Sequence, residues 1–132
     1  MKVRWTRDSL RLRITPSELE MILVGKSVTE RFQLSAGPGW ETAVVPVERT
    51  TELVWVEGVL QVCLSSADRQ RLASPEAEGI YFNHAGDTPL HYFVEKDFPC
   101  AHPRAGDAME KLSETFKPPA GFEARKAAES EP

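Results

Sequence analysis

Apolar and polar residues alternate with a two-residue period over several short stretches of this chain, which is the pattern of strands with one buried face. The first two stretches are residues 2–6 and 10–14, and the short polar spacer between them is typical of a hairpin. Thr15-Pro16-Ser17-Glu18 then has the form of a helix capping box with proline at the first helical position. Further strands are predicted at about 27–34 and 41–45. The order is strand, strand, helix, strand, strand.

The same order of patterns recurs fifty positions later, because residues 2–44 align with 52–94 without a gap. The aligned identities are Trp5 with Trp55, Leu10 with Leu60, Phe32 with Phe82, and Val44 with Val94. Ser65 and Asp68 repeat the helix cap, and later strands are predicted at 79–84 and 90–96. The repeat halves are therefore 2–45 and 52–95.

These patterns predict a single α+β domain over residues 1–100, an internally duplicated β-β-α-β-β unit. We expect one curved or barrel-like, mostly antiparallel sheet with two short helices. Trp5 and Trp55 are expected to be equivalent core residues, so that Trp55→Ala would cost roughly 3–5 kcal/mol. Residues 101–132 are rich in Pro, Gly, Ala, Glu and Lys and predict a flexible tail, with a possible short helix at 107–117.

Composition narrows the class of protein without naming an activity. The chain has 132 residues, 41% of them hydrophobic, which suits one globular domain. Its 16 basic and 20 acidic residues give a net charge of −4, which argues against nucleic-acid binding. No apolar run approaches the roughly 20 residues of a membrane helix. Two cysteines do not make a disulfide framework, so we expect a cytoplasmic protein with reduced thiols. The sequence is compatible with a monomer or a homodimer.

Four cations of the first hairpin form one candidate site. Strand parity places Lys2, Arg4, Arg11 and Arg13 on the face opposite Trp5 and the other apolar residues. Such a cluster can bind phosphate or carboxylate, or it can be an ordinary solvated face that discourages edge pairing. The second half carries no such cluster.

Cys100 is the other candidate, with Lys96 and His102 close to it in the sequence. A nearby cation can lower a thiol pKa and make the cysteine a nucleophile or redox sensor. Cys100 and His102 are also weak candidates for a metal site, because structural sites usually show four ligands in paired short spacings. The sequence contains no catalytic motif and indicates no cofactor. Trp40 and the aromatic residues of 81–93 are candidates for lining a ligand pocket.

The two ends of the predicted domain resemble a known family. Residues 9–18 (SLRLRITPSE) and 94–100 (VEKDFPC) are similar to the opening and closing segments of a family of small uncharacterised bacterial proteins. The resemblance implies a small cytosolic protein and assigns no catalytic residue.

Taken together, the residues favour a non-enzymatic binding or interaction module whose partner is a protein or a small anion. The alternatives are a thiol-dependent enzyme or redox sensor that uses Cys100, and a small metal- or anion-binding protein.

Overall fold

The computed structural model of this chain describes residues 1–99, 114–122 and 124–125. Eight strands and two helices lie in the described part of the chain, in the duplicated order that the sequence predicts. They are β1 (Lys2–Trp5), β2 (Ser9–Ile14), α1 (Pro16–Leu23), β3 (Val28–Phe32), β4 (Trp40–Pro46), β5 (Glu52–Val56), β6 (Val59–Leu64), α2 (Ser66–Ala73), β7 (Gly79–His84) and β8 (Leu90–Lys96).

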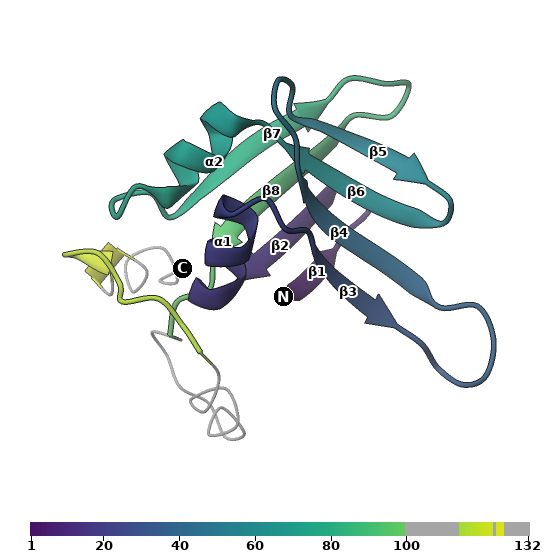
Figure 1. The fold of residues 1–132 in the computed structure, drawn as a ribbon, viewed down its shortest axis with the longest axis horizontal. Helices are drawn as coiled ribbons and strands as arrows, with labels where there is room; N and C mark the ends of the chain where they lie inside the picture. Colours follow the sequence, from purple (N-terminus) through teal and green to yellow (C-terminus); the bar gives the residue numbers. More distant parts are fainter. Residues whose placement is uncertain (100–113, 123, 126–132) are drawn as a thin grey trace.

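The strands form two four-stranded sheets. Sheet A has the order β1-β2-β8-β7, and sheet B has the order β3-β4-β6-β5. In each sheet two antiparallel hairpins join through a central parallel pair, β2 with β8 and β4 with β6. The α+β class, the duplication and the two short helices are thus confirmed. In the described residues the strands divide between two sheets and do not close into a barrel, and each hairpin pairs with a hairpin of the other half (Figure 1).

The two halves of the chain are consequently intertwined. Each half gives its first hairpin to one sheet and its second hairpin to the other. The register repeats as well: Trp5 lies opposite Leu10 in sheet A, and Trp55 lies opposite Leu60 in sheet B. The duplication read from the sequence is therefore present as pseudo-twofold symmetry between the sheets.

The symmetry departs from the fifty-residue offset in one place. Val28 pairs with Val44, whereas Ile80 pairs with Val94, so Val28 corresponds to Ile80 with an offset of 52 residues. Counted from the end of each helix to these equivalent residues, the connection after α2 is two residues longer than its counterpart, and the β7–β8 loop is two residues shorter than the β3–β4 loop. Phe82 therefore corresponds to Glu30, and its alignment with Phe32 does not reflect structural equivalence.

The core lies between the inner faces of the sheets and the apolar sides of the helices, which both lie on one side of the strands (Figure 1). Both predicted caps are confirmed, because Thr15 accepts a hydrogen bond from the Glu18 amide and Ser65 accepts one from the Asp68 amide. The largest fully buried side chains are Leu10, Leu12, Ile14, Ile22, Leu64, Leu72, Ile80, Val44, Val62, Val94 and Thr42.

Trp5 and Trp55 are equivalent in register, but they are not core residues. Their exposed fractions are 55% and 59%, so the prediction of buried indoles is wrong. Each residue lies on an edge strand, at the end next to the hairpin turn, where neighbouring strands cover it on one side only. The period of a strand indicates which face a residue occupies and does not indicate how far along that face the core extends.

Part of the tail contacts the domain. The Phe116 amide donates a 2.8 Å hydrogen bond to the Asp97 carbonyl, and the Phe98 ring lies 6.2 Å from Phe116 and 4.6 Å from Phe122. Phe122 is only 6% exposed. The helix expected at 107–117 lies largely outside the described residues, and residues 114–117 are not helical. No helix within the described residues is long and apolar enough to cross a membrane.

Candidate functional site

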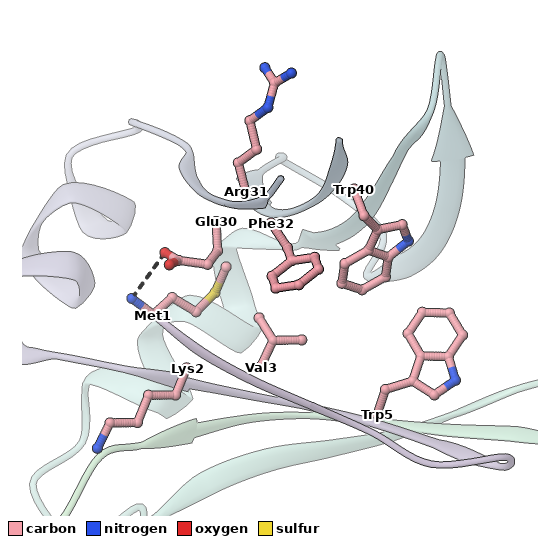
Figure 2. A pocket seen from close by; sticks show the side chains of 8 residues that line it. All are labelled: Met1, Lys2, Val3, Trp5, Glu30, Arg31, Phe32 and Trp40. Carbon is pink, nitrogen blue, oxygen red and sulfur yellow. Dashed lines mark ion pairs between the residues drawn. The ribbon is translucent and has the colours of Figure 1, made fainter. Parts of the chain in front are cut away.

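An open cleft of about 740 Å³ separates the β1 edge of sheet A from β3 and β4 of sheet B. Figure 2 shows side chains from both sheets facing one another across it. Its lining consists of Met1, Lys2, Val3, Trp5, Glu30, Arg31, Phe32 and Trp40. A volume of several hundred Å³ with mostly apolar and aromatic walls is typical of small-molecule sites.

The pseudo-symmetry explains why a cleft is present on this side of the molecule. At the corresponding positions between β5 and β7, Phe82 and Tyr92 face inward and stack with ring centroids 5.1 Å apart. On the β1–β3 side, the equivalent cross-strand pair is Glu30 with Thr42. Two smaller polar side chains thus replace two aromatic rings, and the space between the sheets is left unfilled.

Three aromatic rings form the outer walls of the cleft. Trp5 and Trp40 meet edge to face, with centroids 5.1 Å apart and planes at 65°. Phe32 lies opposite Trp40 in the β3–β4 register and is 63% exposed. Exposed aromatic rings that lie close together on a surface often mark a binding site, where a ligand covers them.

Charged groups lie at the inner end of the cleft. The Met1 ammonium is buried and lies 2.7 Å from Glu18 Oε2 and 3.6 Å from Glu30 Oε2. The other two cations of the lining point away from the cavity and have acids of their own (Figure 2). Lys2 Nζ lies 3.0 Å from Asp97 Oδ2, and Arg31 Nη1 lies 3.2 Å from Glu41 Oε1. The negative charge of Glu30 is therefore the least balanced by a nearby cation among the carboxylates in and around the cleft.

The four cations expected on one face of the first hairpin do lie together on the outer face of sheet A. In the register of the β1–β2 hairpin, Lys2 lies opposite Arg13 and Arg4 lies opposite Arg11. Carboxylates of the chain itself occupy much of this face. Glu95 lies 3.3 Å from Arg11 Nε and 4.0 Å from Arg13 Nε, in addition to the Lys2–Asp97 pair.

Aromatic residues extend the same outer face. The Arg11 guanidinium lies 5.5 Å from the centre of the Phe93 ring, and Tyr81 contacts Phe93 at 5.4 Å. Burial, followed by the charges of Glu95 and Glu78, raises the pKa of Tyr81. Three of the four cations thus have a carboxylate of the chain nearby, and the Arg11 guanidinium is also stacked on the Phe93 ring. Within the described residues, no ion pair joins Arg4.

The thiol candidate is described only in part, because Cys100 and His102 lie outside the described residues. Lys96 is buried, and its Nζ donates a 2.7 Å hydrogen bond to the Ser74 carbonyl at the end of α2. The same Nζ lies 5.5 Å from the centre of the Phe116 ring. Burial lowers the pKa of Lys96. Within the described residues, no three His, Cys, Asp or Glu side chains lie close enough to hold a metal ion.

Sequence reasoning named Trp40 as a pocket residue and missed the rest of the cleft. It assigned Trp5 to the core and used Phe32 only as a mark of the repeat. Glu30 received no role, because the gapless alignment hides the fact that an aromatic residue stands at its structural equivalent. An alignment of the two halves with a two-residue gap between α2 and β7 would have placed Phe82 opposite Glu30 and revealed this difference.

Comparison with known proteins identifies a family but no activity. A family model described as a family of unknown function (DUF7009) matches residues 1–120. No curated protein and no solved structure matches the chain.

Proposed function

We propose that this chain, which belongs to the DUF7009 family, is a non-enzymatic binding domain for a small ligand and that its site is the cleft between β1 and β3. The observation that carries the proposal is the asymmetry between the two sides of the molecule. On one side Phe82 and Tyr92 stack, whereas the other side has Glu30 and Thr42 at the equivalent positions and exposed aromatic walls around the cleft. Because the cleft side has no such aromatic pair at these positions, it has room for a ligand.

The outer face of sheet A supports a binding role less well. A free anion there would have to displace Glu95 from Arg11 and Arg13, and Asp97 from Lys2. Because three of the four cations on the arginine face already have a carboxylate of the chain nearby, we take the cleft as the site, and the partner in this proposal is a small molecule.

The proposal includes a cytoplasmic, bacterial setting. Support comes from the resemblance of the hairpin and closing segments to small bacterial proteins and from Cys63, a free and buried thiol. Buried free cysteine suits a reducing compartment. The chain would act there as a monomer or a homodimer.

Ligand-observed NMR with a library of small aromatic fragments tests the proposal. Fragments that bind the cleft should compete with one another, and Trp40→Ala should abolish their binding because it removes one wall. Trp55→Ala is the control, since it removes an exposed indole that does not line the cleft and that lies at the position equivalent to Trp5. Fragment binding that is absent, or that Trp40→Ala leaves unchanged, would contradict a ligand site in this cleft.

A further inference from the structure

We infer that the ligand of the cleft is a small organic cation with an alkylated ammonium group. The inference rests on the proposed function, because it names the chemistry of a ligand for the same cleft. Two observations carry it: the cleft holds one carboxylate in excess, and its other walls are aromatic rings. Aromatic walls beside a carboxylate are the surroundings in which a poorly hydrated cation is stabilised.

The charge argument follows from the pairing of each ionised group. Of the cations in the lining, Lys2 is neutralised by Asp97 and Arg31 by Glu41. The Met1 ammonium lies closer to Glu18 than to Glu30, at 2.7 Å against 3.6 Å. Glu30 therefore contributes one negative charge beyond those that the cations balance, and it is 49% exposed at the cavity. A cation can approach it without displacing a stronger pair.

The ring geometry fits the same ligand. Trp5 and Trp40 stand at 65° to one another, so they wall off a corner and cannot both stack on one flat molecule. Figure 2 shows Glu30 and Met1 at one end of the cleft, the two indoles at the other, and Phe32 and Val3 between them. A compact group with methyls on several sides contacts such a corner better than a flat anionic ring does, and its charge gains from the π faces.

The volume favours a free small molecule over a larger partner. About 740 Å³ lies within the range of small-molecule sites. The Met1 ammonium, which is paired with Glu18, lies at the end of the cleft opposite the two indoles (Figure 2). We therefore commit to a free alkylammonium compound as the occupant, with choline as the simplest probe.

The test uses the full chain with Trp55→Phe, in which the two cleft indoles are the remaining tryptophans. Their fluorescence is titrated with choline chloride, which replaces sodium chloride so that ionic strength stays constant. The neutral isostere 3,3-dimethylbutan-1-ol is titrated in parallel, and sodium benzoate serves as an anionic ring. We expect a saturable change with choline, at least tenfold weaker binding of the neutral alcohol, and no saturable change with benzoate.

Variants identify the groups responsible. Glu30→Gln should weaken choline binding at least tenfold and leave the binding of the neutral alcohol unchanged. Glu76→Gln is the matched control, because it removes the same charge from an exposed residue in the connection between α2 and β7. A far-ultraviolet circular dichroism spectrum of each variant checks that it is folded.

The outcomes separate the two proposals. Equal binding of choline and the neutral alcohol, or preference for benzoate, would overturn the cation inference and keep the cleft as a ligand site. Failure of choline in a protein that still binds neutral aromatic fragments at Trp40 would do the same. Absence of every ligand from the cleft would overturn both.

Discussion

Trp5 and Trp55 illustrate how identical residues at equivalent positions acquire different surroundings. Both lie at the turn end of an edge strand, and both are more than half exposed. Trp5 meets Trp40 edge to face, whereas the residue at the position equivalent to Trp40 in the other half is Leu90. The same indole therefore forms part of a cleft wall in one half only.

The exposure of Trp55 leads to a stability prediction. Trp55→Ala should lower the free energy of unfolding by about 1–2 kcal/mol, because much of the indole is already in water. Leu60→Ala is the matched control, since Leu60 lies directly across the hairpin and is 8% exposed; it should cost about 2–5 kcal/mol. Urea unfolding followed by circular dichroism measures both. A larger loss for Trp55→Ala than for Leu60→Ala would contradict the structure.

Cys63 leads to a prediction about alkaline pH. Burial, followed by the charge of Glu52, raises the pKa of the Cys63 thiol above 9.0 in the folded state. Because the unfolded thiol ionises first, the stabilising contribution is complete below pH 9.0 and is lost as pH rises past that value. The stability of the native sequence should therefore fall with pH relative to Cys63→Ala, measured by urea unfolding from pH 7 to about 10. Parallel stability curves for the two proteins would exclude this linkage.

At the scale of single elements, the sequence predicted the features that depend only on residues close together in the chain. The Thr15 and Ser65 caps, the helices they begin and the β7 and β8 strands all lie where the local pattern indicated. The β5–β6 turn at Glu57-Gly58 takes the positive φ angles that hairpin turns require, 48° and 81°. Local rules succeed here because caps and turns are satisfied within a few residues.

The partners of the strands could not be predicted in the same way. Alternation defines the buried face of β2 and carries no information about its neighbour, which is β8 of the other half. The cleft was missed for a related reason. Its residues face inward by parity, so Trp5 and Phe32 look like core residues unless the register and the opposite sheet are known.

The second helix cap can be tested directly. Ser65 Oγ accepts a hydrogen bond from the Asp68 amide, and the Ser65 amide in turn donates to Thr51 Oγ1, which also contacts the Asp68 carboxylate. Ser65→Ala should therefore cost about 1 kcal/mol of unfolding free energy. Ser66→Ala, one residue further on, is the control and should cost less. Equal thermal unfolding midpoints for Ser65→Ala and the native sequence would rule out this role for the cap.

At the scale of the whole molecule, the two halves depend on each other. Each sheet contains one hairpin from each half, and the parallel pairs β2–β8 and β4–β6 join them. The link between halves is short, and residues 48–50 are exposed within it. Neither half can complete a sheet alone, because its central strands would leave an apolar edge without a neighbour.

Cleavage in that link tests this dependence. With a protease site inserted after Arg49, the cut chain should stay associated on size-exclusion chromatography and keep its circular dichroism spectrum. Separated fragments 1–49 and 50–132 should each lack strand signal and regain it on mixing. A stable, folded first fragment that does not dimerise would contradict the intertwined arrangement.

The cross-pairing also sets an order of events when the chain folds. Sheet B joins Val44 to Val62 across a short stretch of sequence, whereas sheet A joins Arg11 to Phe93 across most of the domain. Closing the longer loop costs more chain entropy, so sheet B should acquire hydrogen-exchange protection before sheet A. The β1–β2 hairpin is thus synthesised early and paired last. During translation Leu10, Leu12 and Ile14 are synthesised long before β8, so β2 lacks this neighbouring strand until the ribosome has made it.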